Sequence, residues 1–169
     1  LSDDACFESY EEILAKPKMA DLAIIATMDN LHYQPAMKAI ELGYDILLEK
    51  PIALTLKEVE EIGEEAKRLG RKIGVCHVLR YTPFYSTVKR IIDSGKLGEV
   101  ITIHASENVG YYHQAHSFVR GPWRNKAQSS PMILAKCCHD LDIFRWLMDK
   151  PCQSVCSFGS LRHFRKEFK

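Results

Sequence analysis

Short apolar runs alternate with amphipathic stretches over the first half of the chain. Each run is four to six residues long and ends at a polar or glycine-containing turn, which is typical of buried strands in parallel sheets. Between the runs, apolar residues recur at intervals of three and four, the spacing of a helix with one buried face. The predicted elements are a strand at 22–26, a helix at 35–42, a strand at 45–48, a helix at 56–69 and a strand at 72–77. This alternation predicts an α/β fold with a parallel sheet.

Local signals mark where the predicted helices begin and end. Ser9-Tyr-Glu-Glu12 and Thr55-Leu-Lys-Glu58 have the capping-box pattern, in which the first and fourth side chains satisfy free backbone N–H groups. The first box predicts a short helix at 9–16, ahead of the first strand. Gly43 and Gly70 follow the last apolar positions of two helices, where a left-handed C-terminal cap favours glycine.

The pattern changes after residue 80, where we place a domain boundary. A polar and aromatic stretch at 108–130 shows no elements of its own, and a loop of that length is usually functional or mobile. The predicted elements around it are a helix at 84–92, a strand at 100–105, a helix at 132–148 and a strand at 154–158. Residues 1–80 and 81–169 are therefore expected to belong to different domains.

Composition limits the class of protein, its possible partners and its cellular compartment. Apolar residues make up 46% of the chain and charged residues 27%, as in soluble globular proteins. A net charge of +1 gives no basis for binding nucleic acid or an anionic membrane, and no apolar run approaches the roughly 20 residues of a membrane span. The acidic start at Ser2-Asp3-Asp4 is unlike a signal peptide, and the six cysteines include no Cys-x-x-Cys pair. We therefore expect reduced thiols and a cytoplasmic protein.

A charged turn, Glu49-Lys50-Pro51, directly follows the second predicted strand. Ligands of open α/β sheets bind beyond the carboxyl ends of the strands, so this turn is a candidate for chemistry. The alternative is a solvated surface pair of Glu49 and Lys50. Cys137-Cys138-His139-Asp140 also gathers ligating residue types, but neighbours on a helix diverge by about 100° and cannot converge on one ion. We expect no metal site.

Three stretches, in this order, carry a resemblance to a known family. They are Ile24-Ile-Ala-Thr-Met-Asp-Asn-Leu-His32, Leu48-Glu-Lys-Pro-Ile-Ala-Leu-Thr55, and Cys138-His-Asp-Leu-Asp142 followed by Trp146. Together with Gly95-Lys-Leu-Gly-Glu-Val100 they resemble the Gfo/Idh/MocA family, the relatives of glucose–fructose oxidoreductase and inositol dehydrogenase. The resemblance covers residues 7–150, nearly the whole chain.

The resemblance implies a fold, a reaction and partners. Residues 1–80 would be the C-terminal part of a dinucleotide-binding Rossmann domain, and residues 81–169 the N-terminal part of an α+β substrate domain with a mainly antiparallel sheet. The family uses NAD or NADP to oxidise or reduce a carbinol of a sugar, an inositol or a related polyol. The full-length protein would also form a homo-oligomer through the sheet of its second domain.

Lys50 and His139 are the catalytic candidates that the resemblance implies. Hydride transfer from a carbinol needs a group that takes the hydroxyl proton, and Lys50 at a strand end suits this role or that of orienting the reacting oxygen. His139 and Lys136 fall on one face of a predicted helix, so both are also expected to contact substrate. A histidine packed in the core is the alternative for His139. The Lys50–Pro51 bond is expected to be cis, as it tends to be in family structures.

Further residues are expected to contact the cofactor or the substrate. The expected cofactor contacts are Thr27, Asn30, His32, Glu49, Lys50, Pro51 and Arg80. The first three lie between a strand end and a helix start, where backbone N–H groups are free to bind anions, with an N-cap role as the alternative for Asn30. The expected substrate contacts are Lys50, Trp123, Lys136 and His139. Aromatic rings stack well on sugars, but loop aromatics such as Trp123 more often only pack.

One position departs from the family pattern. Several sugar- and inositol-dehydrogenase relatives carry an aspartate four residues before the histidine, where this chain has Ala135. If that aspartate pairs with the histidine or holds the substrate, Asp142 or Lys136 must take over its role here. The departure weakens the inference about the substrate more than the inference about hydride transfer.

The glycine fingerprint of dinucleotide-binding loops is absent from the 169 residues. It needs glycines two and then three positions apart after a strand, and no two glycines of this chain lie two positions apart. We therefore expect an internal piece of a dehydrogenase that is inactive by itself. The alternative is a non-catalytic α/β interaction module. The genomic sequence upstream of Leu1 separates the two, because an in-frame strand ending in Gly-x-Gly-x-x-Gly indicates the enzyme.

Overall fold

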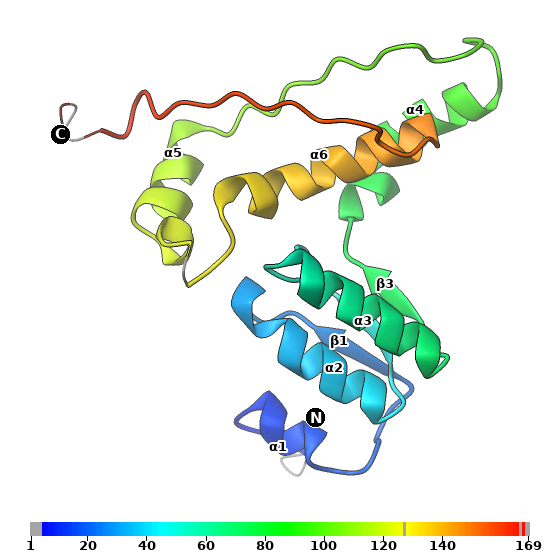
Figure 1. The fold of residues 1–169 in the computed structure, drawn as a ribbon, viewed down its shortest axis with the longest axis vertical. Coiled ribbons are helices and arrows are strands. Elements are labelled where there is room, and N and C mark those ends of the chain that lie inside the picture. Colours follow the sequence, from blue (N-terminus) through cyan, green and yellow to red (C-terminus); the bar gives the residue numbers. More distant parts are fainter. Residues whose placement is uncertain (1–4, 127, 166, 168–169) are drawn as a thin grey trace.

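The computed structural model describes residues 5–126, 128–165 and 167, and its first half is built on a three-stranded parallel sheet (Figure 1). The strands are β1 (Leu22–Ile25), β2 (Asp45–Leu48) and β3 (Ile73–Val75), and they lie in the order β1-β2-β3. Both strand pairs are parallel, with Ile25 opposite Leu48 and Leu48 opposite Val75 at the carboxyl ends. The predicted parallel α/β arrangement is confirmed.

Three helices belong to the first half. They are α1 (Tyr10–Leu14), α2 (Tyr33–Glu41) and α3 (Leu56–Arg68). Helices α2 and α3 share the core with the sheet, and α1 packs against α2. Both predicted capping interactions form, since Ser9 accepts from the Glu12 N–H and Thr55 forms a complete box with Glu58. Gly43 has a φ of +85°, a left-handed conformation that favours glycine and lets the chain turn from α2 into β2.

The apolar core lies on one face of the sheet, beneath α2 and α3 (Figure 1). Its largest fully buried side chains are Ile40, Ile46, Leu48 and Ile62. On the other face of β1, Leu22 is 49% and Ile24 67% exposed. Strand side chains alternate between the two faces, so this pattern shows that the described helices cover one face only.

The carboxyl ends of all three parallel strands lie along the same side of the sheet, which we call the ligand edge. After β1 comes the short 3-10 helix η2 (Asp29–Leu31), after β2 comes the turn at Lys50, and after β3 comes the 3-10 helix η3 (Val78–Tyr81). The Lys50–Pro51 peptide bond is cis, as expected. This is the edge at which open α/β sheets bind ligands.

The second half contains helices but no sheet in the part of the chain that the structure describes. Its elements are α4 (Pro83–Asp93), α5 (Tyr111–His113), the π-helical segment η4 (Gln114–Val119), the 3-10 helix η5 (Pro122–Arg124) and α6 (Met132–Met148). The helix predicted at 132–148 is confirmed with the same bounds. No helix among the described residues is long and apolar enough to cross a membrane.

Three predictions for the second half were wrong. Residues 100–105 and 154–158 were expected to form strands, but the chain there has no regular secondary structure. A β-branched sequence favours extended backbone, yet a strand also needs a neighbouring strand to accept its hydrogen bonds, and the described residues provide none. The stretch at 108–130 was expected to lack elements, but three short helical segments fold it. Each is too short to show periodicity in the sequence.

Candidate active site

Helix α6 lies across the carboxyl ends of the strands. Three polar contacts hold it there. Just before α6, the Ser130 hydroxyl donates to the Asp29 carboxylate, which follows β1. Within α6, the Ala135 carbonyl accepts a hydrogen bond from Lys50, which follows β2. Further along α6, Asp142 accepts from Arg80, which follows β3. These contacts follow the order of the strands in the sheet. The strand ends and one face of α6 therefore line a single site.

The Lys50 ammonium is half-buried at the centre of this edge. Its Nζ donates a hydrogen bond to the backbone oxygen of Ala135, 3.1 Å away, and no ion pair joins it to a carboxylate within the described residues. Ala135 is 3% exposed, so at the position where the family pattern has an aspartate the backbone, rather than a side chain, holds Lys50. A cation that lacks a carboxylate partner is suited to stabilise a negatively charged oxygen.

Glu49 faces its own strand ends. Its N–H donates to the Ile25 carbonyl at 2.9 Å, and its Oε2 accepts from the Lys50 N–H at 3.1 Å. Burial raises the pKa of the Cys76 thiol, and the charge of Glu49 and a hydrogen bond with it raise that pKa further. Glu49 therefore ties the turn after β2 to the end of β1 and lies near Cys76 after β3, and it remains half-exposed.

His139 on α6 meets a second histidine, His77, which the sequence analysis did not select. The two rings pack edge to face, with centroids 5.8 Å apart. The Nδ1 atom of each ring is buried and has no hydrogen-bond partner within the described residues. His77 follows β3 at the ligand edge, so the rule that selected Lys50 after β2 was enough to find it.

Burial lowers the pKa of both histidines. For His139, the Lys50 charge and the neighbouring His77 lower the pKa further, while Asp140 opposes them. For His77, the nearby Asp142, 4.0 Å from its Nε2, raises the pKa, and Arg80 and Lys50 lower it. Both imidazoles are therefore held in the neutral form at pH 7, in which a ring nitrogen can accept a proton.

The Lys50–His139 coupling predicts a measurable shift. In an NMR titration of the imidazoles, His139 should titrate below the ordinary value of about 6.5. Lys50→Met removes a nearby positive charge that disfavours the imidazolium, so the pKa of His139 should rise. Lys57→Met is the matched control, because the Lys57 side chain is 83% exposed on α3 and pairs with Glu61. A His139 pKa that is the same in all three proteins would show that Lys50 lies too far away to act on it.

The guanidinium of Arg80 is paired with a carboxylate on α6. Its Nε and Nη2 donate to the two carboxylate oxygens of Asp142 at 2.7 and 2.5 Å, and this pairing raises the pKa of Arg80. The guanidinium also lies 5.6 Å from the ring centre of Trp146. Asp142 is thus the partner of Arg80, which makes it a poor replacement for the aspartate expected next to His139. The geometry gives Arg80 a role in holding η3 against α6.

The turn after β1 brings together the residues expected to contact cofactor, but only some of them are accessible. Asn30 is exposed within η2 and caps no helix, whereas the Thr27 hydroxyl donates to the Leu31 carbonyl at 2.9 Å. His32 is 1% exposed, with Nδ1 2.7 Å from the Pro51 carbonyl and Nε2 3.1 Å from the Thr27 carbonyl. His32 therefore links the turns after β1 and β2 and offers no exposed face to a cofactor.

Asp29 and Trp123 form a contact that sequence reasoning missed. The indole Nε1–H of Trp123 donates to Asp29 Oδ2 at 3.0 Å, across 94 positions of sequence. Trp123 lies in η5, which directly follows Gly121. The backbone at Gly121 packs so closely against the preceding segment that a Cβ there would overlap the carbonyl oxygens of His116 and Ser117. The only sequence signal for Asp29 was a carboxylate close behind a strand end.

Lys136 lies apart from the Lys50 contact. It lines a separate hollow of about 250 Å³ with Glu107, Asn108 and His113, although its charge still contributes to the low pKa of His139. Within the described part of the chain, no three His, Cys, Asp or Glu side chains gather as metal ligands would. Cys138 lies half-buried, and burial raises the pKa of its thiol.

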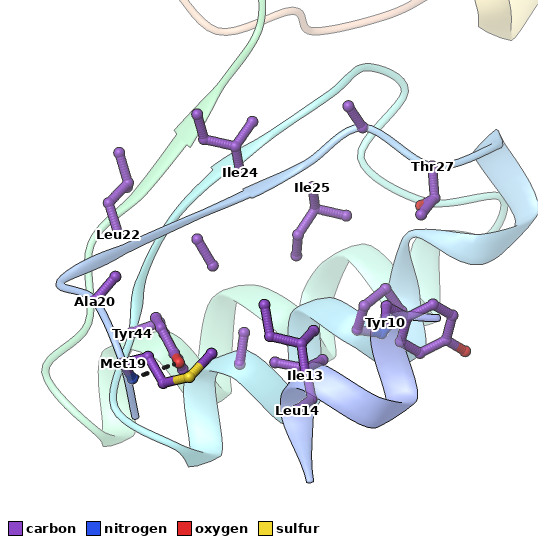
Figure 2. A pocket seen from close by; sticks show the side chains of 14 residues that line it. Tyr10, Ile13, Leu14, Met19, Ala20, Leu22, Ile24, Ile25, Thr27 and Tyr44 are labelled. Atoms are coloured by element: carbon purple, nitrogen blue, oxygen red, sulfur yellow. Dashed lines mark hydrogen bonds between the residues drawn. The ribbon is translucent and has the colours of Figure 1, made fainter. Parts of the chain in front are cut away.

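A second hollow, of about 320 Å³, lies between α1 and β1 (Figure 2). Its lining is apolar apart from groups such as Thr27 and the two tyrosines Tyr10 and Tyr44, and the Tyr44 hydroxyl accepts from the Met19 N–H at 2.9 Å. Among the described residues, no charged side chain lines it. It offers packing surface rather than catalytic groups, so the site at the strand ends remains the candidate.

Two family models match the chain. One, described as "Oxidoreductase family, NAD-binding Rossmann fold", matches residues 2–77, and the other, described as "GFO/IDH/MocA C-terminal domain", matches residues 85–168. This chain belongs to the Gfo/Idh/MocA family. The resemblance seen in the sequence is confirmed, and the Lys50 turn lies within the Rossmann-type match.

Known relatives of this Gfo/Idh/MocA chain include sugar and inositol enzymes. It is 32% identical to the scyllo-inositol 2-dehydrogenase (NAD(+)) of Bacillus subtilis, over 91% of this chain and 42% of the relative. It is 26% identical to the 2,7-anhydro-N-acetylneuraminate hydratase of Mediterraneibacter gnavus, over 98% of this chain and 43% of the relative. An NAD-binding oxidoreductase of Klebsiella pneumoniae superposes with a TM-score of 0.73 at 27% identity, over 84% of this chain and 37% of that protein. The chain thus spans about two fifths of the length of its curated relatives.

Proposed function

We propose that the full-length protein carrying this chain is an oxidoreductase that transfers a hydride between NAD or NADP and a carbinol of a sugar, an inositol or a related polyol. The observation that supports this most is the hydrogen bond from Lys50 to the Ala135 carbonyl, one helical turn before His139, at the ligand edge of a Rossmann-type sheet. Named relatives include dehydrogenases that use NAD(+) and NADP(+). In this proposal residues 1–80 belong to the nucleotide domain and residues 81–169 to the substrate domain.

The two catalytic side chains divide the work on the substrate hydroxyl. His139 accepts its proton, since burial lowers the pKa of the ring and favours its neutral form, and Nδ1 has no hydrogen-bond partner within the described residues. Lys50 holds the oxygen as negative charge develops on it, because its ammonium lacks a carboxylate partner. A bound nicotinamide would supply the acceptor for the hydride. Trp123 borders the substrate side in this proposal, whereas Lys136 lines the separate hollow and acts on the site only through its charge near His139.

The described residues fit one half of the dinucleotide. Half-exposed Glu49 and exposed Asn30 stand at adjacent strand ends and would contact the ribose and nicotinamide, together with Thr27. The pyrophosphate needs a glycine-rich loop at a helix N-terminus, and none of the 169 residues forms the fingerprint of such a loop. The cofactor therefore needs further chain for most of its binding energy.

This division predicts that residues 1–169 alone bind NADH poorly. Calorimetry should detect no binding tighter than about 1 mM, since the main anion-binding element is missing. We also expect no turnover by this chain alone. The full-length protein is the control and should bind in the ordinary range for cofactors. Micromolar binding by residues 1–169 would contradict this account of the cofactor site.

The function is tested by screening the full-length protein. Sugars, inositols and amino sugars are offered with NAD or NADP while the nicotinamide absorbance is followed. Because one relative is named a hydratase, each mixture is also examined for addition or loss of water without net reduction. We expect a polyol or sugar that reduces the cofactor. Water chemistry with no cofactor reduction for any substrate would contradict the proposal.

The same proposal includes a compartment and an assembly. All six cysteines lie among the described residues and are free, which supports a reducing cytoplasm. We propose a homo-oligomer that forms through the second-domain sheet. Supporting this, Ile101, Val155 and Phe158 are 75%, 84% and 94% exposed on segments without regular structure, an apolar surface that strand pairing would cover.

A further inference from the structure

Asp29 is a buried carboxylate with partners far away in the sequence. It is 7% exposed, and its Oδ2 accepts hydrogen bonds from Trp123 Nε1 and Ser130 Oγ, which lie 94 and 101 positions further along the chain. Ser130 is fully buried. Burying a carboxylate is costly unless it is hydrogen-bonded, so a carboxylate retained here calls for an explanation.

Ser130 immediately precedes Pro131, the N-cap of α6. Five residues after Ser130, the Ala135 carbonyl accepts from Lys50. The start of α6 is therefore held at two points, one by the turn after β1 and one by the turn after β2. His139 stands one turn further along the same helix, so its position relative to Lys50 depends on both attachments.

The two turns are themselves joined beneath the site. Buried His32, three residues after Asp29, lies within hydrogen-bond distance of the carbonyls of Thr27 and Pro51. Asp29, His32, the Lys50 turn and the start of α6 thus form one closed set of contacts. A change at Asp29 frees one of the two attachments of the start of α6 and leaves the other in place.

We propose that Asp29 is a positioning residue, which sets the geometry between Lys50 and His139 by fixing the start of α6 and Trp123 against the turn after β1. The inference rests on the proposed function. Asp29 itself touches no reacting atom. A displacement of about 1 Å between catalytic groups can lower the reaction rate about 100-fold. A change at Asp29 is therefore expected to lower kcat rather than to weaken cofactor binding.

The structure supplies a conservative variant and a matched control. Only Oδ2 of Asp29 accepts hydrogen bonds from Trp123 and Ser130, so Asp29→Asn can keep both contacts through its single amide oxygen. Asp45 provides the control. Its Oδ1 accepts from the Lys72 N–H at 2.9 Å, at the amino end of the same sheet. Asp45→Ala therefore removes a carboxylate contact from the same domain but not from the site.

The experiment measures kcat, the KM for cofactor, and amide hydrogen exchange of residues 128–139 in the full-length protein. Asp29→Ala should lower kcat about 30-fold, change the cofactor KM less than about threefold, and speed exchange at the start of α6. Asp29→Asn should retain most of kcat, and Asp45→Ala should match the wild type. Ser130→Ala, a smaller change, should lower kcat about fivefold and should add little when combined with Asp29→Ala.

Each outcome decides the inference. Unchanged kcat and unchanged exchange in Asp29→Ala would overturn it, and so would an equal loss in Asp45→Ala. If Asp29→Ala does not fold, Ser130→Ala decides in the same way. If the wild-type protein reduces no cofactor with any substrate, the proposed function fails. Exchange at residues 128–139 then still tests whether Asp29 holds α6, so the two failures are distinguishable.

Discussion

Replacing Lys50 by alanine in the full-length protein is expected to lower kcat about 1,000-fold, within the usual range for a group that handles a proton or a developing charge. The cofactor Kd should change less than about threefold, because the dinucleotide is held mainly by its phosphates. Lys50 donates a hydrogen bond from the turn after β2 to the α6 backbone. In the proposed mechanism its loss removes the positive charge near the substrate oxygen, and it also frees one attachment of α6.

Two variants separate charge from geometry at this position. Lys50→Arg keeps a positive charge, but its planar guanidinium does not reproduce the compact ammonium group of lysine. Its kcat should therefore stay about 100-fold below that of the wild type. Lys57→Ala, at the exposed lysine of α3, should behave like the wild type. Turnover by Lys50→Ala at the wild-type rate would remove Lys50 from the mechanism, even if the protein proves to be a dehydrogenase.

Replacing His139 by glutamine is expected to lower kcat/KM about 300-fold at pH 7.5, because an amide can accept a hydrogen bond but cannot take up a proton. The pH profile gives the sharper test. Burial and Lys50 lower the pKa of His139, so the wild-type rate should fall on the acid side only below the ordinary value of about 6.5. The fall occurs because protonation removes the base.

The glutamine variant should lose this acid limb, since no imidazole remains at position 139 to titrate. His104→Gln is the control, because His104 is exposed on the chain between α4 and α5. His104→Gln should keep both the wild-type kcat/KM and the acid limb of the pH profile. An acid limb that persists unchanged in His139→Gln would assign the titration to another group, of which His77, in contact with His139, is the first to examine.

Local sequence signals predicted the first half of the fold well. The Thr55 capping box, the left-handed Gly43 and the apolar runs act within a few residues, so they carry their information in short stretches. The ligand edge could also be predicted, because parallel strands end on the same side. Lys50 was selected by that rule, and the cis bond to Pro51 by family resemblance.

The contacts across the site could not be predicted in the same way. Asp29 and Trp123 are 94 positions apart, and no local pattern joins them. The pairing of Arg80 with Asp142 left Asp142 unsuited to the role of the missing aspartate. At Ala135 the side chain was the focus of the sequence argument, yet its backbone oxygen makes the contact with Lys50. A sequence does not show which backbone atoms will face a site.

The failed strand predictions have a related cause. Val100-Ile-Thr-Ile-His-Ala105 has strong β propensity, but strand formation depends on a partner whose position is set by the whole fold. The segment remains without regular structure, with Ile101 75% exposed. Propensity alone thus did not determine whether this segment forms a strand.

The central claim, that Lys50 and His139 serve hydride transfer, is tested most directly by following deuterium. A polyol or sugar that carries deuterium on its carbinol carbon is incubated with the full-length protein and oxidised cofactor, and the reduced cofactor is analysed by mass spectrometry. The account predicts deuterium on the nicotinamide in the wild type and almost none in Lys50→Ala over the same time. Transfer that proceeds equally in Lys50→Ala, or reduced cofactor that carries no deuterium, would contradict it.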